Sequence, residues 1–255
     1  MIKPKESDLK TGTFDTWALI EQRKAADAVV VVKVDDKAAT RQAIIAALRR
    51  AGFTFKTRSE WKAKQGKNSD GPDWDYHAIA LHHAGNSFSC TADGAEQLRK
   101  AESIDLASFG HISYHYAIDC AGIIYEALDI REKGAHIASA NTGVIGIVML
   151  SDLSERGEAY KKEYASKSLF GKVKGILNWG GDMVDLESDA VNEQQIKALS
   201  ELVKVLQSRF VIRALGGHQE FQQLATGEGR ACPGARGMLL VEMLRRDYKI
   251  GPPKK

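Results

Sequence analysis

The chain has 255 residues, 44% of them hydrophobic, so it can bury a substantial core and lies at the upper end of single-domain sizes. Its 36 basic and 33 acidic side chains leave a net charge of only +3, which is too small for a protein that binds nucleic acid by neutralising many phosphates. Three widely spaced cysteines do not form the pattern of a small secreted domain held together by disulfides. Composition therefore favours one globular domain with additions and excludes a nucleic-acid partner.

The N-terminal sequence is charged and contains no long apolar run. Its first apolar run, Val29–Val32, is too short for the core of a signal peptide or for a membrane span. We therefore expect synthesis in the cytoplasm without a Sec-type signal peptide, and no insertion into a membrane. A substrate outside the cytoplasm would be reached by cell lysis, by a dedicated secretion machine or with a carrier protein.

Residues 1–55 are predicted to form an N-terminal extension of unknown role. The β-branched run Val29–Val34 predicts a strand, and Asp36 is a suitable N-cap for a helix with apolar residues at helical spacing. Gly52 would end this helix. The segment shows no binding motif, so it could contact the cell wall, a partner or secretion machinery, or only extend the fold.

Strand and helix signals alternate between residues 76 and 150. In chain order, the sequence predicts a strand at 76–81, a helix at 93–107, two short strands at 113–118 and 123–128, and a strand at 144–150. The two short strands have the signal of a hairpin, because a turn sequence ending in Gly122 joins them. The first strand of the series delivers His82 and His83 to its C-terminal end.

The C-terminal part continues this alternation. It contains a charged stretch at about 151–190 that we interpret as a mainly helical insertion, a helix that begins after Asn192, a strand at 211–215 and a last amphipathic helix at 235–246. Asn192 and Gln195 resemble a capping box. His218 follows the strand in a Gly-Gly-His turn. Strands that alternate with helices indicate an α/β protein.

Three candidate metal ligands lie at or after predicted strand ends: His82, His218 and Cys232. Two imidazoles and one thiolate suit Zn²⁺, and three protein ligands leave the fourth tetrahedral position to water, as in catalytic sites. The spacing is unspecific by itself, because no Cys-x-x-Cys or His-Glu-x-x-His motif occurs. On the residues alone, His83 could equally be an ordinary core histidine and Cys232 a small buried hydrophobic residue.

Several short motifs occur in an order that is characteristic of one family. They are Arg58-Ser-Glu-Trp61, Leu81-His-His-Ala-Gly85, Ser113-Tyr-His-Tyr-Ala-Ile118, Ile124-Tyr-Glu126, the segment from His136 through Gly146-Ile-Val148, and Gly217-His218 with Ala231-Cys-Pro-Gly234. Over residues 56–246 the chain resembles the peptidoglycan recognition protein and type 2 N-acetylmuramoyl-L-alanine amidase family, which includes the T7-type phage lysozyme. The resemblance implies a central mixed β-sheet flanked by helices. It places the domain at 56–248, with insertions at about 151–190 and 219–229 and a tail at 249–255.

The resemblance also implies the site residues. His82, His218 and Cys232 match the family's ligands for one zinc ion per chain, and His83 is then only a neighbour. Tyr114 matches a tyrosine that faces the catalytic water, so we expect it to act in catalysis.

Arg230 stands where phage-type enzymes have a lysine that assists catalysis. We expect Arg230 to be catalytic as a donor to the substrate oxygen, since arginine stabilises an oxyanion but does not give up its proton at neutral pH. Asn86, His136 and Asn141 match a segment that lines the family's groove, and we expect them to bind substrate; His136 and Asn141 could also simply hydrogen-bond loop backbone. Cys90 lacks the partner cysteine that animal recognition proteins have close by, so we expect a free thiol.

The implied function is zinc-dependent hydrolysis of the amide bond between N-acetylmuramic acid and L-alanine of peptidoglycan, a bacteriolytic activity. Zinc lowers the pKa of water that it binds towards neutrality, so no serine or cysteine nucleophile is required. Two alternatives are a recognition module that binds peptidoglycan without cutting it, and a domain whose zinc is structural. A phage endolysin and an antibacterial toxin with an immunity protein as partner both agree with a chain that lacks a signal peptide.

Overall fold

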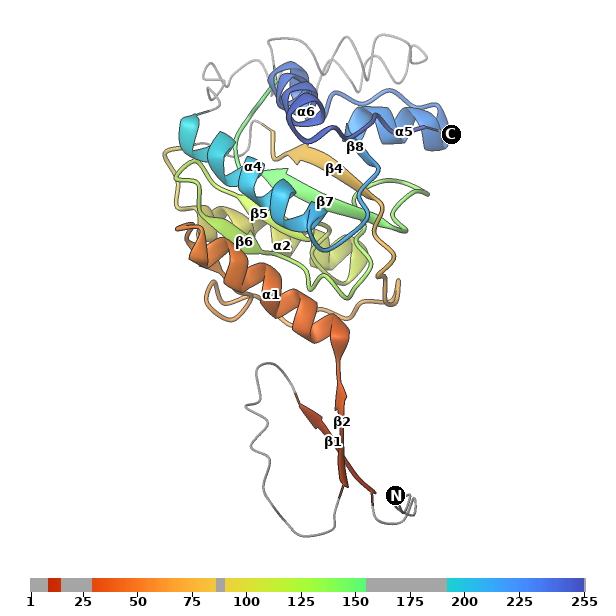
Figure 1. The fold of residues 1–255 in the computed structure, drawn as a ribbon. Coiled ribbons are helices and arrows are strands. Elements are labelled where there is room, and N and C mark those ends of the chain that lie inside the picture. Colours follow the sequence, from red (N-terminus) through yellow and green to blue (C-terminus); the bar gives the residue numbers. More distant parts are fainter. Residues whose placement is uncertain (1–8, 15–28, 86–89, 155–191, 255) are drawn as a thin grey trace.

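The computed structural model describes residues 9–14, 29–85, 90–154 and 192–254 (Figure 1). In chain order the elements are β1 (Leu9–Phe14), β2 (Val29–Val34), α1 (Asp36–Arg50), β3 (Phe55–Lys56), β4 (Ala78–His83), α2 (Gly94–Phe109), β5 (Tyr116–Ile118), β6 (Ile124–Glu126), β7 (Val144–Met149), α4 (Glu193–Gln207), β8 (Ala214–Gly217), α5 (His218–Thr226) and α6 (Gly234–Tyr248). Among these residues, no helix is long and apolar enough to cross a membrane.

Six strands form the central sheet, in the order β3-β6-β5-β7-β4-β8. Strands β5 and β6 are antiparallel, as the hairpin signal predicted, and the other neighbouring pairs are parallel. Strands β4 and β7 pair along their full length, from Ala78 opposite Val144 to His83 opposite Met149. Helices cover both faces, with α1 and α4 in front of the sheet and α2 behind it (Figure 1). The predicted fold class, an α/β protein with a mixed sheet flanked by helices, is confirmed.

Alternation along β4 decides which face of the sheet carries the candidate site. Ile79 and Leu81 point into the larger core cluster, which includes side chains of α1, α4 and α6. Ala78 and Ala80 belong to a separate cluster with a side chain of α5. Because successive side chains of a strand point to opposite faces, His82 lies on the same face as Ala78 and Ala80. Each fully buried Ile or Leu side chain contributes roughly 1.5–3 kcal/mol to the stability of the fold. This burial holds β4 in place and thereby sets the position of His82.

Helix α1 packs on the main core although the sequence placed it in the N-terminal extension. Its Ile44, Ile45 and Leu48 are at most 2% exposed. The expected N-cap, Asp36, is wrong by one residue, because the carboxylate of Asp35 accepts hydrogen bonds from the N–H groups of the first turn. Gly52 follows the helix with φ +90°, a left-handed conformation that favours glycine at a helix end.

Strands β1 and β2 form a two-stranded parallel sheet of their own, with Leu9 opposite Val29 and Phe14 opposite Val34. This small sheet lies apart from the six-stranded sheet and is joined to it through α1 (Figure 1). The role of the extension and the predicted division of the chain at residue 55 stay predictions.

The two predicted insertions have different outcomes. Most of the stretch at 151–190 lies outside the described residues. The insertion at 219–229, which the sequence indicated as a longer loop, is wrong in form, because most of it is helix α5. At the end of the chain, Gly251 pairs with Ala214 and Ile250 is 5% exposed, so part of the predicted tail packs against β8.

Candidate metal centre

The fold brings the three predicted metal ligands together. Strands β4 and β8 are parallel neighbours with Leu81 opposite Gly217. The residues that come next after these two, His82 and His218, therefore lie side by side. Their ring centroids are 4.6 Å apart. One ligand atom from each of His82, His218 and Cys232 lies within 4.8 Å of the others.

Cys232 reaches this cluster from the segment between α5 and α6. Its carbonyl accepts a hydrogen bond of 2.8 Å from the Gln219 N–H, which ties the segment to the start of α5. Its Sγ lies 3.6 Å from Nδ1 of His82. Two nitrogen donors and one sulfur donor at this spacing fit zinc, and three protein ligands leave one tetrahedral position open.

Burial keeps both histidines of the cluster neutral. His82 is 1% exposed, and desolvation lowers its pKa well below the usual value, with a further lowering from His218. Desolvation lowers the pKa of His218 to about 4, while a side-chain hydrogen bond with Gln222 acts in the opposite direction. A metal binds the lone pair of a neutral imidazole, so both ligands are in the required protonation state at neutral pH.

Tyr114 lies beside the ligands, as expected. Its ring meets the ring of His82 edge-on at 4.9 Å between centroids. Burial raises the pKa of the Tyr114 hydroxyl, and the nearby Cys232 and Asp105 raise it further. The hydroxyl therefore keeps its proton at neutral pH and is available as a hydrogen-bond donor. Its catalytic role stays a prediction.

Arg230 stands two residues before the ligand Cys232, and its charge lowers the pKa of His218. Its side chain is 39% exposed, and Nη2 is 3.4 Å from a carboxylate oxygen of Glu228. Within the part of the chain that the structure describes, the buried Nε of Arg230 has no hydrogen-bond partner. The guanidinium thus has donor capacity to offer a ligand, and its predicted role in catalysis stays a prediction.

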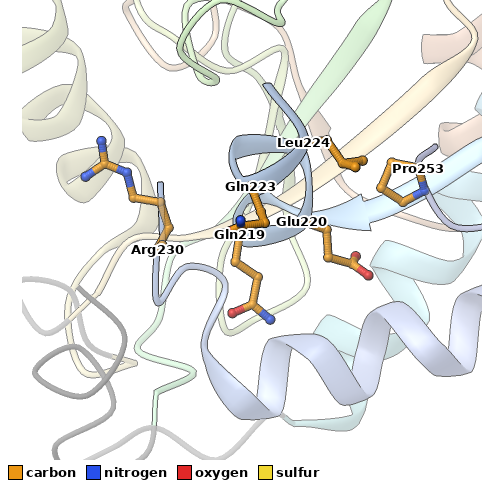
Figure 2. A pocket seen from close by; sticks show the side chains of 7 residues that line it. Gln219, Glu220, Gln223, Leu224, Arg230 and Pro253 are labelled. Carbon is orange, nitrogen blue, oxygen red and sulfur yellow. The ribbon is translucent and has the colours of Figure 1, made fainter. Parts of the chain in front are cut away.

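An open depression of about 480 Å³ adjoins this arginine along α5. Its lining residues are Gln219, Glu220, Gln223, Leu224, Gly229, Arg230 and Pro253. Figure 2 shows Arg230 on one side of the depression and Leu224 with Pro253 on the other. The wall of the depression is thus built largely from α5.

The predicted substrate-binding residues lie in different places. His136 is only 6% exposed, and its Nδ1 is 3.1 Å from Nε2 of His82. The side-chain oxygen of Asn141 accepts hydrogen bonds from the N–H groups of His136 and Ile137, at 2.9 and 2.7 Å. Asn86 lies outside the described residues. For all three, contact with substrate stays a prediction.

Two further residues, His83 and Gln222, lie close to the candidate ligands but do not belong to the metal-binding group. His83 points away from the cluster, because its Nδ1 accepts a hydrogen bond of 3.1 Å from the Leu153 N–H and lies 3.4 Å from Asp152. Gln222, which the sequence analysis missed, is 0% exposed and hydrogen-bonds His218. Its position four residues after His218 was the available signal, because residues at this spacing share one face of a helix.

The expected free thiol at Cys90 is wrong. Cys90 forms a disulfide with Cys120 across a Cα–Cα distance of 5.2 Å, and the two residues are 30 positions apart in the sequence. The expectation considered only a partner close in sequence, whereas the fold brings the turn between β5 and β6 to Cys90. Cys232 stays outside this disulfide and lies among the metal ligands.

Comparison with known proteins agrees with this geometry. Residues 73–235, well over half of the chain, match the N-acetylmuramoyl-L-alanine amidase family. The peptidoglycan-recognition proteins SD of Drosophila melanogaster and Drosophila simulans are each 26% identical over 117 residues, which is 44% of this chain and 63% of theirs. The match thus spans less than two thirds of the length of these relatives.

Solved structures share the fold. Drosophila PGRP-SD superposes with a TM-score of 0.54 at 22% identity, covering 74% of this chain and 94% of that one. Human PGRP-IβC in complex with glycosamyl muramyl pentapeptide gives 0.53 at 13% identity, covering 74% and 94%. The endolysin N-acetylmuramoyl-L-alanine amidase LysCS of Clostridium intestinale gives 0.50 at 16% identity, covering 77% and 96%. From the matched span that includes all three candidate ligands, we conclude that the chain belongs to the N-acetylmuramoyl-L-alanine amidase family.

Proposed function

We propose that the protein is a zinc-dependent amidase that hydrolyses the bond between N-acetylmuramic acid and L-alanine in peptidoglycan. The observation that carries the proposal is the convergence of ligand atoms from His82, His218 and Cys232 within 4.8 Å, beside the partly buried ring of Tyr114. A set of three ligands is typical of catalytic zinc, whereas structural zinc sites are closed by four. The donor set therefore favours hydrolysis over a structural metal.

Each residue of the site has a defined task in this proposal. His82 and His218, as neutral imidazoles, and Cys232, as thiolate, hold the metal. When bound, zinc supplies a water molecule activated near neutral pH and polarises the amide carbonyl. As the carbon becomes tetrahedral, negative charge develops on the carbonyl oxygen, and the Tyr114 hydroxyl and the Arg230 guanidinium donate hydrogen bonds to it.

Tyr114 and Arg230 act as donors and not as bases. The raised pKa of Tyr114 keeps its proton on the hydroxyl oxygen, and an arginine stays charged at any relevant pH. Neither group takes the proton that the attacking water loses. We therefore expect both residues to raise the rate by stabilising the negative charge on the carbonyl oxygen.

A second candidate function is a module that binds peptidoglycan without cutting it. The similarity to the peptidoglycan-recognition proteins SD, at 26% identity over 117 residues, favours it. Both functions make peptidoglycan the partner. Action on a cell wall reached by lysis or by a specialised secretion route, with or without an immunity protein, belongs to the same proposal.

Digestion of purified sacculi separates the candidates. The zinc-loaded protein and its Cys232→Ser variant are incubated with sacculi, and the soluble products are identified by mass spectrometry. We expect free stem peptides with an N-terminal L-alanine from the parent protein and none from Cys232→Ser. A matched control is His111→Asn, since His111 is 3% exposed and its Nδ1 hydrogen-bonds the carbonyl oxygen of Ile112 at 2.8 Å.

Three other results would each point elsewhere. Uncut sacculi that retain the protein would establish the recognition module. Zinc-dependent melting without cleavage of any wall fragment would make the metal structural. Normal cleavage by Cys232→Ser would remove the metal from the mechanism.

A further inference from the structure

The loop between β6 and β7 contacts one of the metal ligands through a buried histidine pair. Nε2 of His82 lies 3.1 Å from Nδ1 of His136, and both side chains are nearly inaccessible to solvent. On the far side of its ring, Nε2 of His136 lies 3.2 Å from the carbonyl oxygen of Val144. The three groups form a continuous row that starts at a ligand and ends on the backbone of β7.

These hydrogen bonds determine the tautomer of each histidine. A carbonyl oxygen only accepts, so Nε2 of His136 must carry the hydrogen and donate it to Val144. Nδ1 of the neutral His136 then has a lone pair, which accepts the hydrogen on Nε2 of His82. The lone pair of His82 is left on Nδ1, the nitrogen that faces Cys232 Sγ at 3.6 Å. His136 therefore selects the one tautomer of His82 that can bind a metal there.

A second set of contacts links the other histidine ligand to the same loop. The side-chain oxygen of Gln222 accepts a hydrogen bond of 3.2 Å from the Ala138 N–H. Its amide nitrogen donates to Thr226 Oγ1 at 2.7 Å. Gln222 lies four residues after His218 on α5, so the two side chains share one face of this helix.

The loop itself is held rigid from within. Asn141 accepts from two consecutive N–H groups, those of His136 and Ile137. The N–H of Ala138 is the next in the chain, and Gln222 accepts from it. Three successive backbone N–H groups are thus held by side chains. At one end of this stretch His136 contacts the ligand His82, and at the other end Ala138 contacts Gln222 of α5.

We infer that the stretch His136–Asn141, together with Gln222, orients both histidine ligands before the metal arrives. His136 and Gln222 are positioning residues, which act through His82 and His218. The inference rests on the proposed metal site and deepens it. Outer hydrogen-bond partners of metal ligands fix ring orientation and tautomer, and their loss typically lowers metal affinity about 10–100-fold.

The test measures zinc affinity by competition with a chromophoric chelator, which needs no turnover. We expect His136→Ala to bind zinc about 10–100-fold more weakly than the parent protein. His136→Asn should recover most of the loss, because its amide oxygen can take the place of Nδ1 and accept from His82. The control His111→Asn should keep the parent affinity, since it removes an equally buried histidine that contacts no metal ligand.

Gln222→Leu is an independent arm with its own control. It should weaken zinc binding and shift the visible absorption bands of the Co²⁺-substituted protein, which report the ligand arrangement. Thr226→Val removes the hydroxyl that accepts from the Gln222 amide nitrogen, and should do neither. Melting of the metal-free forms identifies any variant that does not fold; should His136→Ala fail in this way, His136→Asn and Gln222→Leu decide the outcome.

Equal zinc affinity in the parent protein and in folded His136→Ala or Gln222→Leu would overturn the inference. The proposed hydrolysis fails separately. A parent protein that binds zinc tightly, shows the expected order of affinities and leaves sacculi intact would contradict the amidase while keeping the role of the loop.

Discussion

Two buried histidines, His82 near the end of β4 and His115 directly before β5, have different surroundings. His115 has both ring nitrogens satisfied by protein: Nδ1 accepts from the Gly146 N–H at 3.0 Å, and Nε2 donates to the Glu132 carbonyl at 3.0 Å. His82 has one nitrogen against His136, while the other faces the sulfur of Cys232 and the ring of His218. Burial alone therefore does not distinguish a structural histidine from a metal ligand. The distinction depends on which group the second ring nitrogen faces.

Replacing each histidine in turn tests this difference most directly. His82→Ala should abolish both zinc retention and cleavage, a loss well beyond the roughly 10–100-fold cost of an outer hydrogen-bond partner. His115→Asn should keep one zinc per chain and the cleavage activity while melting at lower temperature. Metal analysis after dialysis and product release from sacculi measure both. Zinc retained by His82→Ala, or lost from His115→Asn, would contradict the assignment of His82 as a metal ligand and His115 as a structural histidine.

A pair of tyrosines tests the same contrast at the level of rate. Tyr114→Phe removes a donor beside His82 and should lower the cleavage rate about 10²–10³-fold with zinc content unchanged. Tyr76→Phe removes the hydroxyl that lies 3.0 Å from Nε2 of His115. It should leave the rate intact and cost about 0.5–1.5 kcal/mol of stability, the usual net value of one hydrogen bond. Equal rates for Tyr114→Phe and the parent protein would remove Tyr114 from catalysis.

Arg230 should give a smaller effect than Tyr114. Its side chain is 39% exposed, so water screens its charge and can partly replace its hydrogen bonds. We expect Arg230→Ala to slow cleavage less than Tyr114→Phe does, and Arg230→Lys to keep more of the rate than Arg230→Ala because it retains the positive charge. Rates at saturating substrate measure both. A rate for Arg230→Ala equal to that of the parent protein would show that the arginine only borders the site.

The acid response of the metal-free protein tests the surroundings of His115 through stability alone. Burial lowers the pKa of His115 to about 4, against about 6.5 for an unperturbed histidine. The unfolded chain thus binds more protons in this window, so the contribution is fully present above about pH 6.5 and is lost as the pH falls towards 4. The slope is at most about 1.4 kcal/mol per pH unit for one histidine. Urea titrations of the parent protein and His115→Asn should converge on acidification; parallel curves would contradict a buried neutral His115.

Much of the fold could be predicted because its signals are local. Strands β4 and β7 are continuous apolar runs, and six-residue strands buried on both faces follow from such runs. The pair Asn192 and Gln195 predicted the start of α4, where Asn192 accepts from the Gln195 N–H at 2.8 Å. The form of the 219–229 insertion was not predicted, because a helix carrying His218 as its first residue needs contacts such as the Glu220–Arg245 ion pair at 2.6 Å.

By itself, the sequence determined the order of the main strands and helices, the candidate ligands His82, His218 and Cys232, and the family resemblance that joined them. These depend on apolar periodicity and on short motifs, which are properties of neighbouring residues.

Only the tertiary structure decided the pairing of Cys90 with Cys120 and the supports of the two histidine ligands. His82 meets His136 across 54 positions, and Gln222 meets Ala138 across 84. The orientation of a buried imidazole depends on which donor or acceptor the fold brings to its second nitrogen, and no local pattern in the chain encodes that choice.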